Sequence, residues 1–267
     1  VAGPLGRSAE DLDLLLSVVA GPDELAAPGW RLDLPVPRAT KPHELRAAVW
    51  IDDPYCDIDA ESAALLNNAA KALEVAGAHV DRAARPDFTL AWSTEVYLTL
   101  LHSLTAARFP SKVKERLAER ARGLPEGDRS HLTIQARGAN ISFADRLVWL
   151  EHQAQLRAKW EAFFRDFDVV LAPVMMRPAF PHDQRSNWHE RRLNVNGIER
   201  EYFDVLIWAG PAMVAQLPAT VVPVGVTKDG LPVGLQIIGP HLGDRTTIAA
   251  AGMVEALLGG FRAPPGF

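Results

Sequence analysis

The amino-acid sequence predicts an α/β fold, and three segments carry that prediction. A strand–helix–strand unit spans residues 45–80, a continuous apolar run typical of a buried strand covers residues 168–172, and two β-rich runs between residues 220 and 238 form a hairpin. We expect residues 1–267 to be a single α/β unit with a helical middle section at about residues 88–166.

The first predicted element is an amphipathic helix. Ser8 and Asp11 have the spacing of a capping box, and apolar residues then recur at helical spacing until Gly21 and Pro22 stop the run. Residues 30–42 contain three prolines among polar residues. This composition predicts an extended connection that crosses the surface.

Next comes the strand–helix–strand unit. Residues 45–51 and 78–80 are its strands, Asp59 caps the start of the helix between them and Gly77 caps its end. Apolar residues at helical spacing give this helix one buried face, which comprises Leu66, Ala69, Ala70 and Leu73. The unit therefore predicts two neighbouring parallel strands.

The middle section is predicted to be helical. Its three helices cover residues 90–109, 111–122 and 142–167, with a polar break between the second and the third. The buried strand at 168–172 follows and is ended by Pro173. After it we expect an irregular loop that runs through residues 196–197, and loops of that length are often functional.

The last third predicts a hairpin and a closing helix. Residues 220–226 and 231–238 are joined by Asp229 and Gly230, a strong hairpin signal. Pro223 and Pro232 lack the N–H that a strand donates, so they should sit at bulges or face outward. Residues 244–258 form the final helix.

Composition excludes several classes of protein. The 28 basic and 33 acidic residues give a net charge of −5 without a basic cluster, so we expect no nucleic-acid partner. Residues 205–227 carry no formal charge, but three prolines argue against a membrane-spanning helix there, and we expect no membrane partner. The single cysteine, Cys56, excludes an intramolecular disulfide and favours a cytoplasmic location.

Several weak motifs are better explained structurally. Ser111 and Lys114 match S-x-x-K but open a charged surface helix. The four aspartates around Cys56 should raise the pKa of its thiol. A loop holds four potential metal ligands, His182, Asp183, His189 and Glu190, but in no fixed helical phase. We expect no metal and no cofactor.

Three segments resemble the amidase signature family. Residues 3–12 read G-P-L-G-R-S-A-E-D-L and are similar to its G-P-[ML]-x-R-S-x-x-D-[LA] segment, and residues 167–173 resemble its F-D-x-[LV]-[LV]-x-P strand. Residues 217–225 followed by D-G-L-P-V-G-L-Q-I-I-G-P at 229–240 resemble its closing signature. The resemblance implies the C-terminal half of a mixed, mostly parallel β-sheet that is covered by helices on both faces.

The resemblance also implies a chemistry: hydrolysis of a carboxylic amide through an acyl-serine, with a second serine in a cis peptide and a lysine as base. In the family this Gly/Ser-rich core precedes the G-P-x-x-R-S segment, which starts here at Gly3. None of the nine serines is adjacent to another, and none of the six lysines matches the family's base. We therefore assign no catalytic residue and expect the Ser–cisSer–Lys set upstream of Val1.

Two functional hypotheses follow. In the first, this chain is inactive alone and completes an amidase whose N-terminal part belongs to the same protein or to a second chain. In the second, it is a non-catalytic relic or binding module that keeps the outer half of the fold. A long hydrophobic strand edge left open by a missing half predicts poor solubility alone or burial against a partner, and a homo-oligomer is compatible with this.

The substrate in the first hypothesis is a small-molecule amide that the sequence does not specify. Its pocket is expected to be lined by the loop after the buried strand and by the turn near residue 209. The predicted substrate-binding residues are Pro173, Met175, Met176, Arg177, Trp208, Ala209 and Gly210. Gln236, a lone polar residue in an apolar run, is instead expected to be a hydrogen-bonded core amide.

Overall fold

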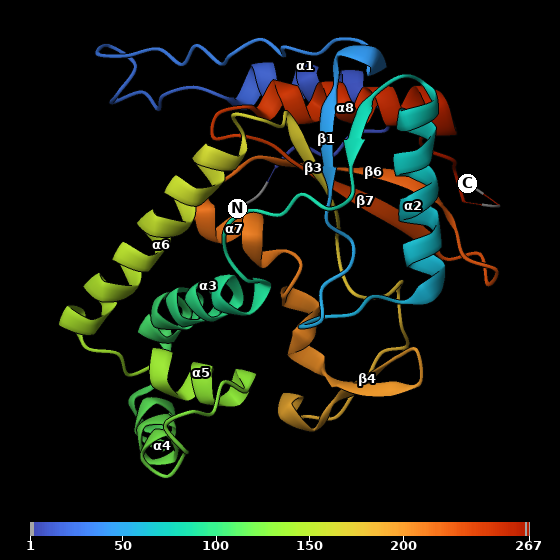
Figure 1. Ribbon diagram of the computed structural model, residues 1–267. Helices are drawn as coiled ribbons and strands as arrows, with labels where there is room; N and C mark the ends of the chain where they lie inside the picture. Colours follow the sequence, from blue (N-terminus) through green and yellow to red (C-terminus); the bar gives the residue numbers. More distant parts are fainter. Residues whose placement is uncertain (1–2, 265, 267) are drawn as a thin grey trace.

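The computed structural model describes residues 3–264 and residue 266, and its centre is a five-stranded sheet of order β2-β1-β3-β7-β6 (Figure 1). Strand β1 pairs in parallel with β2 and β3, while β7 is antiparallel to β3 and β6. Strand β7 is thus reversed relative to the other four, which confirms the mixed, mostly parallel sheet. The strands are β1 (Arg46–Val49), β2 (His79–Asp81), β3 (Val169–Pro173), β6 (Ala219–Val226) and β7 (Pro232–Ile238).

Helices cover both faces of this sheet, as predicted. Thr220 of β6 shares a hydrogen bond of 2.8 Å with Thr247 of α8 (Asp244–Leu258). The register partner of Thr220 on β7 is Ile237. The next residue, Gln236, donates a hydrogen bond to the Trp208 oxygen, just before α7 (Gly210–Ala215). Because successive strand residues point to opposite faces, α8 and α7 lie on opposite sides of the sheet.

The first face is covered by α8 together with α2 (Ala60–Val75), and α1 (Ala9–Val19) packs on the outside of α8 (Figure 1). Helix α2 begins at the cap Asp59, whose side chain accepts from the backbone N–H groups of Glu61 and Ser62. The predicted capping box at Ser8 and Asp11 of α1 is also present. The strand–helix–strand prediction is therefore confirmed by the order β1–α2–β2.

The middle section contains four helices, one more than predicted. They are α3 (Leu90–Thr105), α4 (Ser111–Arg122), α5 (His131–Gly138) and α6 (Phe143–Phe163). Short 3-10 turns are η1 (Pro42–Glu44), η2 (Ala106–Arg108), η3 (Trp188–Glu190) and η4 (Tyr202–Leu206). Helix α5 was not predicted because its eight residues give only a weak periodic signal. It packs closely on α3 because Gly138 has no side chain. A Cβ at this position would lie 3.1 Å from the Thr99 backbone oxygen.

The prediction of an irregular loop from the end of β3 through residues 196–197 is wrong from residue 192 onward. There β4 (Arg192–Val195) and β5 (Ile198–Glu201) form an antiparallel hairpin. Asn196 and Gly197 connect the strands with φ values of 53° and 84°, the left-handed region that a two-residue hairpin turn requires. The Asn196 side chain accepts from the Ala60 N–H and donates to the Ile58 oxygen, at 3.0 Å each, and fastens the turn to the start of α2.

An aromatic cluster joins the helical section to the sheet. Trp50, directly after β1, lies 6.3 Å from Trp160 of α6 and 5.9 Å from Trp208, measured between ring centroids. All three indoles are almost fully buried. Phe88 packs edge-on against both Trp50 and Trp160. The cluster makes α6 and the segment before α7 part of the same core as the strands.

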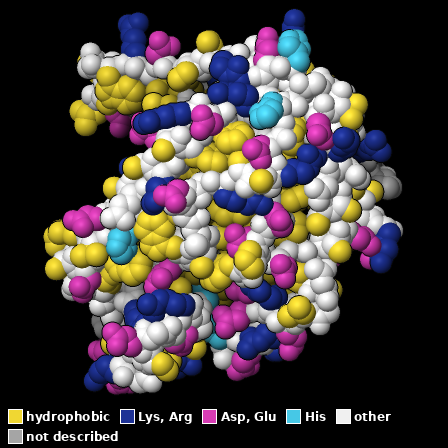
Figure 2. Space-filling model, in the orientation of Figure 1, with side chains coloured by type: hydrophobic (Ala, Val, Ile, Leu, Met, Phe, Trp, Pro, Cys, Tyr) yellow, Lys and Arg dark blue, Asp and Glu magenta, His cyan; other side chains and the backbone are white. Residues whose placement is uncertain are grey.

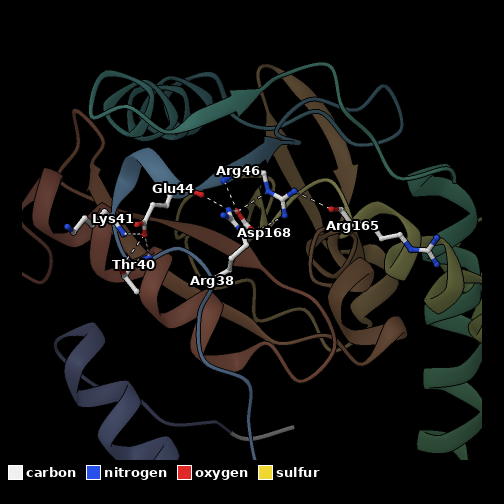
Figure 3. A network of polar contacts seen from close by, with 7 residues as sticks. All are labelled: Arg38, Thr40, Lys41, Glu44, Arg46, Arg165 and Asp168. Atoms are coloured by element: carbon white, nitrogen blue, oxygen red, sulfur yellow. Dashed lines mark hydrogen bonds and ion pairs between the residues drawn. The ribbon is translucent and has the colours of Figure 1, made fainter.

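Asp168 ties the start of β3 to the start of β1 (Figure 3). Its buried carboxylate accepts from the Arg46 backbone N–H at 2.8 Å, from Arg46 Nη2 at 3.0 Å and from Arg38 Nε at 2.8 Å. Burial alone would raise the pKa of Asp168, but these hydrogen bonds outweigh it and lower the pKa below its ordinary value. The aspartate of the F-D-x-[LV]-[LV]-x-P segment is thus a structural counter-ion.

The hairpin β6–β7 follows its prediction. Pro232 starts β7 and Pro223 lies at a register shift between residues 223 and 225, and both are exposed.

Among the described residues, no helix is long and apolar enough to cross a membrane. On the face displayed in Figure 2, acidic and basic side chains are interspersed, without a large area of one sign.

Candidate functional site

A pocket of about 180 Å³ lies where β3 ends, between the start of α2 and the β6–β7 hairpin. Strand β7 begins at the same end of the sheet because it runs antiparallel to β3. Ligand sites in α/β proteins gather beyond the carboxyl ends of strands, which is where this pocket lies. Its lining residues are Ser62, Leu66, Pro173, Val174, Met175, Arg177, Pro178, Ala179, Val221, Pro232, Val233 and Gly234.

Three of the seven residues predicted to bind substrate line this pocket: Pro173, Met175 and Arg177. Met176 does not line it. Its side chain is fully buried in the core, and its carbonyl oxygen accepts from the Asp59 N–H at 2.7 Å. Alternation along the loop therefore turns Met176 inward and anchors the loop to the cap of α2.

Arg177 is the charged residue in the lining. Its Nη1 donates to the Asn194 carbonyl oxygen at 2.6 Å, and its guanidinium carbon lies 5.8 Å from the Phe180 ring centroid. The Nε atom is buried and has no hydrogen-bond partner among the described residues. The loop therefore positions the guanidinium with one carbonyl and one aromatic ring.

The other predicted group, Trp208 to Gly210, lies outside the pocket. The Trp208 indole N–H donates to the Cys56 carbonyl oxygen at 3.2 Å. Gly210 is buried against Tyr97, and a Cβ there would lie 3.0 Å from its ring. Ala209 is the half-buried residue that precedes α7. Substrate contact by these three residues stays a prediction.

Gln236 links the two predicted groups. Its amide nitrogen donates to the Pro173 oxygen and to the Trp208 oxygen, at 3.1 Å each. The side chain is buried, so both bonds satisfy groups that water does not reach. The prediction that Gln236 is a core amide is confirmed, and it holds the end of β3 against the segment before α7.

Cys56 is not a competent nucleophile in this environment. The prediction that its pKa is raised is confirmed, to about 12, but the main cause is burial of the thiol. The negative charges of Asp204 and Asp53 add to this effect, and Arg200 opposes it. The thiol stays protonated and packs in the core.

Side chains of the candidate metal ligands and of the S-x-x-K lysine form hydrogen bonds with other parts of the protein. Asp183 accepts from Arg185 at 3.0 Å, His189 Nε2 lies 3.0 Å from Gln135 Oε1, and the Glu190 carboxylate accepts from Asn187 at 2.7 Å. No cluster of three or more His, Cys, Asp or Glu residues able to hold a metal ion occurs within residues 3–264. Lys114 Nζ donates to the Ala107 oxygen at 3.2 Å, on the surface helix α4.

Two features of the structure were not predicted from the sequence. His102 and His131 form a buried pair with 3.1 Å between their Nε2 atoms, and Phe203 stacks on His131 at 4.2 Å. Burial lowers the pKa of His102 to about 4 and that of His131 to about 3. A cavity of about 840 Å³ also lies between α4 and α6. Both features join segments far apart in the chain, so no local pattern predicts them.

Known proteins resemble this chain along almost all of its length. It is 26% identical over 260 residues to an indoleacetamide hydrolase of Bradyrhizobium diazoefficiens, covering 95% of this chain and 45% of that protein. It is 28% identical over 279 residues to one subunit of the glutamyl-tRNA(Gln) amidotransferase of Exiguobacterium sibiricum, covering 98% and 56%. The chain thus spans about half the length of these curated relatives.

The fold agrees with solved structures as well. A bacterial aryl acylamidase of the amidase signature family superposes with a TM-score of 0.69 at 21% identity, over 96% of this chain and 52% of that one. This likeness shows that the chain is an α/β protein with the fold of that structure. A model of the amidase family matches residues 1–248, so the chain belongs to the amidase family.

Proposed function

We propose that this chain supplies the C-terminal portion of an amidase that hydrolyses a small-molecule carboxylic amide to a carboxylate and ammonia or an amine. The family match over residues 1–248 carries the proposal. The names of the relatives support it, because an indoleacetamide hydrolase cleaves an amide bond. Polypeptide upstream of Val1, or a second chain, contributes the serine, the second serine in a cis peptide and the lysine.

The proposed chemistry proceeds in two steps. The lysine, acting through the second serine, takes the proton from the nucleophilic serine, which attacks the amide carbon. Backbone N–H groups stabilise the tetrahedral oxyanion, the C–N bond breaks, and ammonia or an amine leaves with a proton. Water then attacks the acyl-serine ester and releases the carboxylate. The 267-residue chain supplies none of these reacting groups, so we propose that it is inactive alone.

The exposed face of the edge strand β6 supports the proposal that another structural element packs there. Thr220, Val222 and Val224 are buried against the α2 and α8 side, whereas Val221 on the opposite face is 50% exposed. An exposed apolar sheet face is typical of a surface that another element covers. We propose that the catalytic portion of the amidase, in the same protein or a second chain, packs there in the cytoplasm. Val221 also lines the pocket, so that packing would close the site.

Within the pocket we propose that Pro173, Met175 and Arg177 contact the substrate. Met side chains adapt to varied apolar groups, and Met175 is a half-buried residue of the lining. Met176, Trp208, Ala209 and Gly210 then support the pocket from the core side. This division follows from the burial of Met176, Trp208 and Gly210.

The test compares the chain alone with the chain joined to the polypeptide that its gene encodes upstream. Indole-3-acetamide and an acetanilide serve as substrates, with release of ammonia or aniline as the readout. We expect no turnover by the chain alone and turnover by the joined protein, with an acyl adduct on an upstream serine by mass spectrometry. Turnover by the chain alone would refute the proposal, and an inactive joined protein would favour the binding module.

A further inference from the structure

Arg177 stands in an otherwise uncharged pocket. The lining contributes one hydroxyl, from Ser62, and the remaining side chains are apolar. The Ser62 hydroxyl is engaged, because it donates to Asp59 Oδ1 at 3.3 Å. A ligand that enters this pocket therefore meets one positive charge surrounded by aliphatic walls.

No described residue supplies a counter-ion for this charge. Among the described residues, no carboxylate lies within 4.0 Å of the Arg177 guanidinium, and its one protein acceptor is the Asn194 carbonyl oxygen. Other arginines at strand ends are paired: Arg46 with Asp168 at 3.0 Å and Arg200 with Asp204 at 2.8 Å. The buried Nε of Arg177 also has no hydrogen-bond partner among the described residues.

The guanidinium is also held in place without a counter-ion. Asn194, on β4, fixes one nitrogen, and the Phe180 ring lies beneath the guanidinium carbon. Nη1 is used by Asn194 and the Nε atom is buried, which leaves Nη2 as the guanidinium nitrogen that can take a second partner. A hydrogen bond from an arginine nitrogen to a carboxylate oxygen is charge-assisted and therefore strong.

We propose that Arg177 binds a carboxylate of the substrate, so that the preferred substrates are amides that carry a second, anionic group. This inference rests on the proposed function, because it takes the pocket as part of the amide site. The pocket volume of about 180 Å³ suits a carboxylate and a short aliphatic or aryl stem. Pro173 and Met175 then contact the stem, and the scissile amide extends toward the catalytic portion.

The first experiment measures binding without turnover. The joined protein, with its upstream nucleophilic serine changed to Ala so that no amide is cleaved, is titrated with benzoate and, separately, with the isosteric neutral benzamide, and NMR line shapes report the affinity. We expect benzoate to bind at least tenfold more tightly. Arg177→Gln should abolish this preference and Arg177→Lys should keep part of it, whereas Arg192→Gln, on the exposed side of β4, should leave it unchanged. Equal affinities, or a preference that survives Arg177→Gln in a protein with a native melting curve, would overturn the inference.

The second experiment separates this inference from the proposed function. The joined, active protein is assayed with 4-carbamoylbenzoate and 4-methylbenzamide, which differ in the anionic group. We expect the carboxylated amide to have at least a tenfold higher kcat/KM, lost mainly through KM in Arg177→Gln. Equal rates on both amides would refute the anion site while the amidase proposal stands. Selective benzoate binding by a joined protein that cleaves no amide would refute the amidase proposal while the anion site stands.

Discussion

Strand β3 and helix α4 are opposites in how they are held. Every residue of β3 is buried, whereas α4 has no buried residue and packs mainly on α5. The free energy of folding that depends on apolar burial is therefore concentrated in the sheet, and α4 contributes little of it. The part of the chain that carries the family's strand motif is therefore also its stable centre.

Helix α6 connects the two regions. It has 21 residues, but only Leu156 and Trp160 are buried, and Trp160 is the one that reaches the aromatic cluster at the sheet. Trp160 is thus the fully buried residue through which α6 joins the sheet core, with Phe163 and Phe164 packed beside it. Substitutions that separate the sheet from the helices test whether the comparison is correct.

The largest effect is expected for Trp160→Ala. Removal of this fully buried indole leaves a cavity beside Trp50 and Phe88, and such changes cost about 3–5 kcal/mol. Urea denaturation measures the free energy of unfolding. Leu147→Ala, on the same helix with 46% of the side chain exposed, is the matched control and should change it by about 0.5 kcal/mol or less. Equal losses for both variants would contradict the distinction between buried and exposed positions of α6.

Asp168→Asn should have the next largest effect. It keeps the shape of the side chain but removes the charge that pairs with Arg38 and Arg46, at an expected cost of about 1–3 kcal/mol. The folded pKa of Asp168 is lowered, so this contribution is present above the unfolded pKa and is lost as the pH falls through the folded pKa. Denaturation at pH 7 gives the cost.

The control for that variant is Glu74→Gln, which removes an exposed pair with Lys71. Exposed pairs contribute little, so we expect a much smaller change than for Asp168→Asn. A Glu74→Gln cost as large as that of Asp168→Asn would show that the connection between β1 and β3 is no stronger than a surface ion pair.

The smallest effect concerns the histidine pair that joins α3 and α5. Burial lowers the pKa of both imidazoles, with neighbouring His189 adding repulsion, so between about pH 6.5 and 4 the unfolded chain binds protons that the folded chain does not. Stability should therefore fall as the pH decreases through that range. His102→Gln should reduce the slope by about 1 kcal/mol per pH unit, since one imidazole contributes at most about 1.4.

The matched control for the histidine prediction is His241→Gln. His241 is exposed and contacts the Gln216 carbonyl oxygen at 3.2 Å. Its replacement removes an imidazole from the surface, so a change of slope seen in both variants would not come from the buried pair. A slope that is the same in His102→Gln and the parent protein would show that the buried pair does not titrate on unfolding.

Local patterns predicted most of the sheet. The β6–β7 hairpin, the start of α2 at Asp59 and the closing helix α8 lie where turn residues, a capping residue and apolar spacing placed them. The β4–β5 hairpin was missed although its turn signal, Asn196 followed by Gly197, was present directly after a strand whose residues alternate in burial. The turn residues are typical of a hairpin, but the flanking segments contain too many polar and charged residues to be recognised as strands.

The site was less predictable than the fold. Position after a buried strand identified Pro173, Met175 and Arg177, which do line a pocket. It did not show that Met176 turns inward, because side-chain direction in an irregular loop depends on what the loop packs against. The walls from α2, β6 and β7 come from distant parts of the sequence, and only the folded sheet brings them together.

The interruption in β6 has a consequence for how the sheet can grow. Strand β6 is the outermost strand, Pro223 contributes no amide hydrogen, and the register shift next to it breaks the regular spacing of carbonyl groups. An incoming strand finds an uninterrupted ladder only along residues 219–222. Pairing of further strands along the whole edge of β6, as in a fibril, is therefore disfavoured. One short strand can still pair with residues 219–222.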